Sequence, residues 1–295
     1  MKPRFNLTLL IFTAGAIVIT IALLIAIPAA QRPGTFDAAS AYSLVNDQMA
    51  LGPRIPGSTA HQQVITWMVN ALNQAGWSTS ITNDSAMGHP VQNVVAKKGS
   101  GSPWIILGAH YDSRMKADQD PDIANRTQPV PGADDGASGV AVLLELARVL
   151  SIKQGQVWLA FFDAEDQGDL PGWDWLLGSQ VLADQLTGTP DAVVIIDMIG
   201  DKNLNIYKES SSTPVLVDQI WSAAQKAGHG DVFLPQAKYR MLDDHTPFLN
   251  KGLDAADLID FDYPYWHTTA DTADKVAGDS LKAVGDTLIE WLSTR

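Results

Sequence analysis

Apolar residues along the chain fall into two patterns, short continuous runs and longer stripes with helical spacing. The continuous runs predict buried strands, because the strands of a parallel sheet are covered on both faces. Such strands are expected at residues 91–96, 104–109, 157–162 and 192–196. The stripes predict amphipathic helices, expected at residues 41–77 with a break at 52–59, and at 140–150, 212–228 and 278–293. This alternation predicts an α/β domain with a mainly parallel sheet.

The beginning of the chain carries a different pattern. Residues 7–27 contain no charged side chain, whereas Lys2 and Arg4 precede them. At about 1.5 Å per residue, the run is just long enough to cross the core of a bilayer as a helix. The positive flank would stay inside, so the rest of the chain is expected outside the cytoplasm. A cleaved signal peptide is the alternative, but the run is long for one and residues 27–31 form a poor cleavage site.

These patterns divide the chain into three expected parts. Residues 1–30 form a membrane anchor or signal sequence, residues 31–41 a linker, and residues 42–295 a single domain. The length of the last part suits one large α/β domain. The protein is therefore expected to be anchored in a membrane with this domain outside the cytoplasm, or secreted if the N-terminus is cleaved.

Composition narrows the chemistry that the domain can perform. The formal net charge is −13, which argues against a nucleic-acid partner. The chain has no cysteine, which excludes thiol nucleophiles, thiolate metal sites and disulfides. Any transition-metal site must therefore use histidine, aspartate and glutamate.

Histidine and acidic residues stand at the ends of three expected strands. His110 and Asp112 follow the second strand, Glu165 and Asp166 the third, and Asp197 the fourth. Ligands of open α/β sheets bind at the carboxyl ends of the strands. The sequence therefore predicts that these metal-type ligands meet at one edge of the sheet.

A loop with three glycines at residues 131–139 carries Asp134 and Asp135 and leads directly into an expected helix. A solvated turn is one interpretation of this loop. The acidic strand ends favour the other, in which the loop is a rigid holder for a cation.

The last third of the chain adds further candidates. Asp243, Asp244 and His245 are adjacent, and His267 follows a cluster of aromatic residues. Taken alone, His267 is typical of a surface or internally bonded histidine. Beside the acidic strand ends it becomes a candidate metal ligand.

Zinc suits this set of side chains. Zn²⁺ accepts histidine nitrogen and carboxylate oxygen, and a catalytic zinc site keeps one position open for water or substrate. In the adjacent pair Glu165 and Asp166, one carboxylate can bind metal while the other transfers protons.

Together these residues carry a resemblance to the family that joins co-catalytic zinc aminopeptidases with animal-type glutaminyl cyclases. The matching segments stand in the family's order and span about residues 42–293. They are residues 52–58, 110–113, 132–135, 161–166, 196–200, 243–248 and 266–268. The resemblance implies a zinc exopeptidase fold, a three-layer αβα sandwich with a mainly parallel mixed central sheet.

The resemblance also implies roles for individual residues. Asp135, Asp166 and His267 would be zinc ligands, and Glu165 the general base and acid. The family normally has glutamate at the position of Asp166, so the shorter side chain could shift the metal or weaken its binding.

The two branches of the family differ in metal count. In the aminopeptidases, His110 and Asp197 would complete a second zinc site, with Asp135 bridging. In the cyclases a single zinc is bound, and Asp197 and Asp243 belong to a hydrogen-bonded network with Glu165.

Residues 243–249 and Trp266 resemble the cyclase branch more closely. The resemblance thus implies a glutaminyl-peptide cyclotransferase, which acts on peptide or protein N-termini, forms pyroglutamate and releases ammonia. Trp266 is the first expected substrate contact, with Trp173 or Trp175 as another.

Two alternatives remain at this point. A di-zinc aminopeptidase would release the N-terminal residue of a peptide. A non-catalytic binding domain of the same fold is disfavoured, because all the expected metal ligands and Glu165 are present in the sequence.

Overall fold

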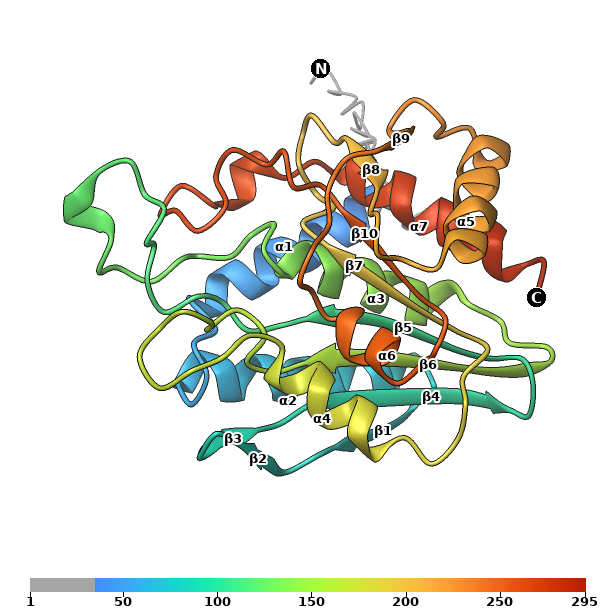
Figure 1. Cartoon of the computed structure of the whole chain (residues 1–295), viewed down its shortest axis with the longest axis horizontal. Helices are drawn as coiled ribbons and strands as arrows, with labels where there is room; N and C mark the ends of the chain where they lie inside the picture. The colour runs from blue at the N-terminus through green and yellow to red at the C-terminus, as the bar shows by residue number, and fades with distance from the viewer. Residues whose placement is uncertain (1–34) are drawn as a thin grey trace, which may run out of the picture. The chain divides into compact units, whose positions relative to one another are not determined.

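The computed structural model describes residues 35–295. Within them, six strands form one sheet in the order β1–β4–β6–β5–β7–β10. The strands are β1 Ser78–Ile81, β4 Val94–Ser100, β5 Trp104–His110, β6 Gly155–Phe162, β7 Ala192–Asp197 and β10 Ala255–Ile259. β5 is parallel to β6 and β7, and β10 is parallel to β7, whereas β4 is antiparallel to β1 and β6. The expected α/β class with a mainly parallel mixed sheet is confirmed (Figure 1).

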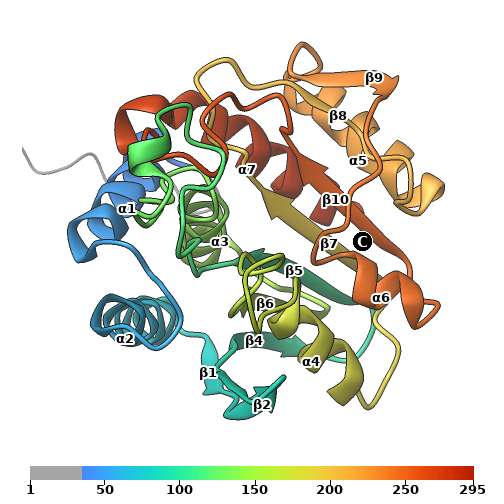
Figure 2. The same cartoon turned by 60° about the vertical axis from the view of Figure 1, so that its left-hand side comes forward.

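Helices cover both faces of this sheet (Figure 2). One layer contains α1 Ala38–Leu51, α2 Thr59–Gln74, α3 Ala137–Val149, α5 Pro214–Ala227 and α7 Gly278–Leu292. The other contains α4 Leu177–Gln185 and α6 Thr246–Asn250. Alternate residues of β5 pack against the two layers: Ile105 and Leu107 join the larger apolar core, whereas Ile106 joins the smaller one. This alternation gives the three layers that the resemblance implied.

The expected strand at 91–96 is divided in the structure. β3 His89–Val91 pairs with β2 Asp84–Ala86, and β4 begins only at Val94. Between them, the Asn93 side chain accepts a hydrogen bond from the backbone N–H of Asp163 (3.0 Å) and donates one to the carbonyl of Gly178 (2.8 Å). These bonds tie Asn93 to the loop after β6 and to the first turn of α4, at the point where the expected strand is divided.

Several short elements were not expected from the sequence. They include β1, β2, β10, α4 and α6, together with β8 Ile206–Lys208, β9 Phe233–Ala237 and the 3₁₀ turns Ile123–Asn125 and Ala273–Lys275. Most of them are too short to leave a periodic pattern.

The folded part begins earlier than the expected end of the linker at residue 41. Phe36 is buried in the core, and Asp37 caps α1 by accepting a hydrogen bond from the backbone N–H of Ser40 (2.9 Å). A Cβ atom at Gly285 of α7 would lie 2.2 Å from the Phe36 ring, so the aromatic side chain packs directly on that helix. The residues around Phe36 therefore belong to the domain and not to a linker.

The expected membrane span at residues 7–27 lies outside the described residues. From residue 35 onward, no helix is both long and apolar enough to cross a bilayer.

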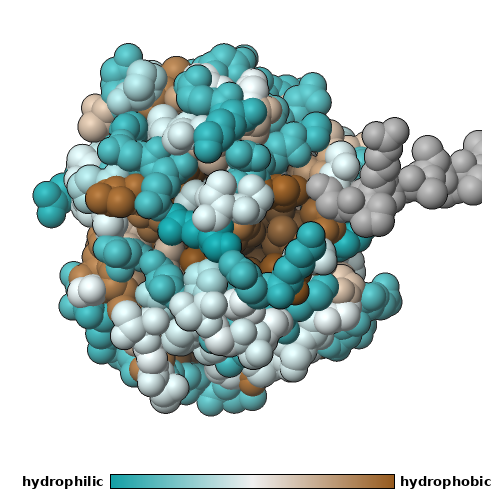
Figure 3. Space-filling view, turned by 90° about the vertical axis from the view of Figure 1, so that its right-hand side faces the viewer, coloured by the Kyte–Doolittle hydropathy of each residue, from teal (hydrophilic) through white to brown (hydrophobic). Residues whose placement is uncertain are grey.

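An apolar groove of about 520 Å³ lies near the amino-terminal end of β5. Its lining includes Pro103, Val149, Ile152, Ile289 and Leu292. Figure 3 views this side of the molecule, where apolar residues lie in a hollow between hydrophilic ones. The groove is at the opposite end of the strand from His110, so it is separate from the acidic residues described next.

Candidate metal centre

Three neighbouring strands of the sheet end beside one another. β6, β5 and β7 are adjacent and parallel, so their carboxyl ends share one edge of the sheet. His110 is the last residue of β5, Asp197 is the last of β7, and Glu165 and Asp166 follow β6 closely. The structure thus brings together the side chains that were expected to meet at this edge.

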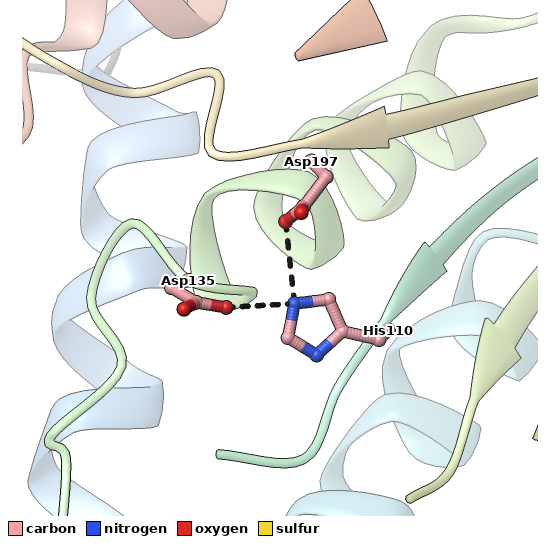
Figure 4. A group of neighbouring side chains, drawn as sticks. All are labelled: His110, Asp135 and Asp197. Carbon is pink, nitrogen blue, oxygen red and sulfur yellow. Dashed lines mark hydrogen bonds and ion pairs between the residues drawn. The ribbon is translucent and has the colours of Figure 1, made fainter. Parts of the chain in front are cut away.

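One group, here called the strand-end triad, consists of His110, Asp135 and Asp197. His110 Nε2 lies 3.0 Å from Asp135 Oδ1 and 3.2 Å from Asp197 Oδ1. Figure 4 shows the imidazole at the end of its strand, pointing between the two carboxylates. All three side chains are buried.

A second group, here called the loop triad, consists of Asp135, Asp166 and His267. His267 Nε2 lies 2.8 Å from Asp166 Oδ1 and 3.8 Å from Asp135 Oδ2. The two oxygens of Asp135 therefore face different histidines, and this carboxylate is shared by both triads.

The backbone of the loop that carries Asp135 is bound by the carboxylate of Asp271, a residue that no sequence pattern marked. The backbone N–H groups of Asp134 and Asp135 donate to the two carboxylate oxygens of Asp271, at 2.9 and 3.3 Å. The next residue, Gly136, is required by close approach, because a Cβ atom there would lie 2.4 Å from His110 Nε2. The glycine lets the shared carboxylate reach the histidine.

Asp112 organises the strand-end side of the centre. Its carboxylate lies 3.4 Å from His110 Nδ1 and accepts hydrogen bonds from the backbone N–H groups of Glu165 (3.1 Å) and Asp166 (3.3 Å). A carboxylate on the outer nitrogen of a ligand histidine fixes its ring and tautomer. Asp112 thereby orients the histidine of one triad and the backbone of the acidic pair.

Arg114 and Asp118 organise the loop side. Arg114 donates from Nε and Nη2 to the two oxygens of Asp118, at 2.9 and 2.7 Å, and from Nη1 to the backbone carbonyl of Asp166 at 3.0 Å. Asp118 Oδ1 in turn lies 3.4 Å from His267 Nδ1. Neither residue was found by sequence reasoning, because both are polar residues in a loop and only the folded chain brings them to His267.

The centre carries more negative than positive charge. Burial raises the pKa of Glu165 well above its ordinary value, and the neighbouring Asp166 raises it further. Burial and the charge of Asp135 raise the pKa of Asp166 to about 6. Burial alone would lower the pKa of His267, but the carboxylates of Asp166 and Asp118 raise it to about 9. Such a cluster is stabilised by a cation.

The donor atoms of the two triads fit zinc. Asp135 Oδ2 and Asp166 Oδ2 are buried and have no hydrogen-bond partner among the described residues. Buried carboxylate oxygens without a partner are costly unless a cation binds them. Imidazole nitrogen and carboxylate oxygen are the ligands that zinc accepts in proteins that use no thiolate. The loop triad offers ligands for one zinc, and the strand-end triad offers ligands for a second that would share Asp135.

A pocket of about 220 Å³ opens on both triads. Its lining residues are Asp135, Glu165, Asp166, Trp175, Asp197, Met198, Met241, Leu242, Asp243, Ile259, Phe261, Trp266 and His267. The Trp266 ring stacks on His267, with 3.8 Å between ring centroids and 25° between planes. The pocket is therefore lined both by aromatic and apolar side chains and by carboxylates.

Of the two further tryptophans considered as substrate contacts, only Trp175 lines this pocket. Trp173 stacks instead on His89 with ring centroids 3.6 Å apart, and lines a separate surface pocket. Trp175 packs over the backbone of Gly168, where a Cβ atom would lie 2.0 Å from the indole. The missing side chain at Gly168 lets the loop turn Trp175, and not Trp173, toward His267.

Comparison with known proteins gives a consistent result. The profile of peptidase family M28 matches residues 93–292. The bovine glutaminyl-peptide cyclotransferase-like protein is 27% identical over 263 residues, which cover 74% of this chain and 66% of that protein. Aminopeptidase YwaD of Bacillus subtilis is 30% identical over 199 residues, which cover 62% of this chain and 39% of that protein. The chain thus spans less than two thirds of the length of either relative.

Solved structures share nearly the whole fold. The glutaminyl cyclase of Bacteroides thetaiotaomicron is 31% identical with a TM-score of 0.84, and the match covers 89% of this chain and 99% of that one. A leucine aminopeptidase precursor of the same species is 32% identical with a TM-score of 0.84, covering 88% and 98%. The similarity therefore reaches both branches that the sequence resembles.

Proposed function

The chain belongs to peptidase family M28, and from this membership we propose that it is a zinc-dependent glutaminyl-peptide cyclotransferase. The reaction would convert an N-terminal glutamine into pyroglutamate and release ammonia. The observation that carries the proposal is the small pocket that Glu165 lines together with Trp266, whose ring stacks on His267. A small pocket that combines aromatic side chains with a few polar groups suits a short side chain with a polar end, such as that of glutamine.

Asp135, Asp166 and His267 are the proposed zinc ligands. Zinc bound there supplies a Lewis acid that polarises the side-chain amide carbonyl of the substrate. The relatives that are named glutaminyl cyclases support this assignment.

Glu165 is the proposed general base and acid. Its carboxylate would take a proton from the α-amine as the nitrogen attacks the amide carbon, and would return a proton to the departing ammonia. The raised pKa of Glu165 supports this role, because an acid with a pKa closer to neutrality both accepts and donates protons more readily. Asp243 and Asp197 line the same pocket, and carboxylates so close to Glu165 would share protons with it.

A di-zinc aminopeptidase is the second candidate, and one observation favours it. The strand-end triad is complete, with His110 Nε2 close to both Asp135 and Asp197. With a second zinc there, Glu165 would take a proton from the attacking water during hydrolysis of the first peptide bond.

Metal content and product together test the two candidates. The purified chain is assayed on peptides that begin with glutamine and with leucine, while its zinc is quantified. Ammonia and a pyroglutamyl product from the first peptide are expected, with the second left intact. Free leucine without ammonia would overturn the cyclase and establish the aminopeptidase.

The variant Glu165→Gln tests the role of Glu165, because it keeps the shape of the side chain and removes its charge. Turnover is expected to fall by about 10²–10⁴-fold with zinc content unchanged. Undiminished turnover in this variant would refute the assignment of Glu165.

We further propose that residues 1–30 anchor the protein in a membrane and that residues 42–295, together with Phe36, Asp37 and the start of α1, form one catalytic domain outside the cytoplasm. The uncharged run at 7–27 behind Lys2 and Arg4 supports this proposal. Fractionation of cells that express the full chain, followed by protease treatment of intact cells, tests both the anchor and its orientation.

A further inference from the structure

Behind the acidic wall of the pocket, the described residues include another histidine–carboxylate group: Asp243, His245 and Asp257. Their ligand atoms lie within 4.8 Å of one another, as do those of the strand-end and loop triads. Asp243 is 4% exposed, and His245 and Asp257 are completely buried. This group has the same composition as the two triads of the pocket, but its use is not explained by the proposed reaction.

Asp257 carries a carboxylate into an apolar layer. It lies within β10 and pairs with Ile195 of β7. Ile195 belongs to the smaller apolar core, together with Phe248 of α6. A charged carboxylate in such a layer is strongly destabilising unless it is paired.

Hydrogen bonds and ion pairs within the protein do not neutralise the buried carboxylates of this group. Both oxygens of Asp257 and both oxygens of Asp244 are buried without a hydrogen-bond partner among the described residues. Within the same part of the chain, no lysine or arginine forms an ion pair with Asp243, Asp244 or Asp257, and the ion-pair partner of Asp257 is His245.

The orientation of His245 points to a cation between it and Asp257. His245 Nε2 lies 3.0 Å from Ser211 Oγ and 3.4 Å from Glu209 Oε2, so this nitrogen faces an acceptor-only carboxylate and carries the proton in the neutral ring. The other nitrogen, Nδ1, then presents a lone pair toward Asp257 Oδ2 at 3.8 Å. That separation is too long for a hydrogen bond. It suits two ligands of one metal, each about 2.0–2.2 Å from the ion.

We propose that Asp243, His245 and Asp257 bind a divalent transition-metal cation, of the Zn²⁺ or Mn²⁺ class, separate from the zinc of the pocket. One imidazole nitrogen and several carboxylate oxygens are donors that these ions accept. The site goes beyond the proposed function and does not depend on it. Because Asp243 also lines the pocket, the cation would fix that carboxylate on the wall opposite the substrate.

Metal binding by an Asp135→Ala chain tests the proposal without interference from the pocket, because this substitution removes the ligand that both pocket triads share. The metal-free variant is equilibrated with Zn²⁺ or Mn²⁺ alone, and bound metal is measured by mass spectrometry and calorimetry. A single equivalent is expected to remain, and chelation is expected to lower the melting temperature. No bound equivalent and a melting temperature indifferent to chelator would overturn the site.

The double variants Asp135→Ala/Asp257→Asn and Asp135→Ala/Asp257→Leu locate the ion. Both are expected to lose the remaining equivalent and the response to chelator. If the group holds only protons, metal content will not change, and leucine will leave the melting temperature equal or higher, because an apolar side chain suits this layer better than a buried carboxyl group. That result would also overturn the site. Should either double variant fail to fold, the Asp135→Ala measurement decides by itself.

Discussion

The strand-end triad and the loop triad share Asp135 but are built differently. His110 and Asp197 are the last residues of β5 and β7 and pair with Phe162 of β6 and Ile259 of β10, so the sheet holds them. Asp166 and His267 lie outside helices and strands, and His267 has a left-handed backbone with a φ of 55°. Non-glycine residues adopt this conformation only when their surroundings enforce it.

On the loop side, His267 is held by a backbone hydrogen bond from the N–H of Gln119 to its carbonyl (3.2 Å) and by side-chain contacts. Arg114 binds Asp118 and the backbone of Asp166, and Asp118 approaches His267. One half of the centre is therefore fixed by the sheet, whereas the other half depends mainly on a small ion-pair network.

Asp135→Ala removes the residue on which both halves depend. We expect complete loss of turnover and of pocket zinc, because each triad loses its shared ligand. Zinc quantification and a peptide assay check this result, with circular dichroism to show that the domain is folded. Retention of activity would contradict the shared role of Asp135.

Replacing each histidine separately distinguishes the halves. For a single-zinc cyclase, His267→Ala should remove the pocket zinc and reduce turnover by at least about 10²-fold, whereas His110→Ala should keep one zinc in the pocket. Zinc content of the two variants is measured after identical dialysis. Equal loss of zinc from both variants would show that the triads bind metal as one unit.

Asp118→Asn weakens only the network on the loop side. The amide keeps the shape of the carboxylate but no longer accepts from Arg114 and His267 as an anion, so zinc affinity should fall by about 10–100-fold. Competition with a chromogenic chelator measures the affinity. The matched control is Asp122→Asn, in an exposed residue that caps the turn Ile123–Asn125, and it should leave zinc affinity unchanged.

The smallest effect is a pH dependence of zinc affinity. A ligand histidine must be neutral, and the pKa of His267 is raised to about 9 in the metal-free protein. Zinc must therefore displace a proton below that pH, and its affinity should fall by up to about tenfold for each unit of decreasing pH. Calorimetry in buffers of different ionisation enthalpy counts the released proton. An affinity that is constant from pH 7 to 9 would contradict the raised pKa.

The free energy of unfolding of the metal-free protein should also depend on pH through His267, but it should decrease as the pH rises, whereas zinc affinity increases. Because the folded pKa of His267 lies above its ordinary value of about 6.5, its charge stabilises the fold fully below that pH. The contribution is lost as the pH rises through about 9.

The contrast also explains how much the sequence could predict. β5, β6 and β7 leave continuous apolar runs, so their ends and the residues His110 and Asp197 were found directly. β10 was missed, because Asp257 interrupts an already short run. Arg114 and Asp118 were missed for another reason: their role depends on contact with a residue about 150 positions away, which no local pattern records.

The shared carboxylate of Asp135 has a thermodynamic consequence. Two cations on one carboxylate repel each other and divide its charge, so occupation of either triad weakens binding at the other by the same factor. Zinc binding to the two pocket triads should then be biphasic, with a tight step and a weak step. The number of ions on the purified protein would reflect the free zinc concentration during its preparation, and not only the number of ligands that the fold provides.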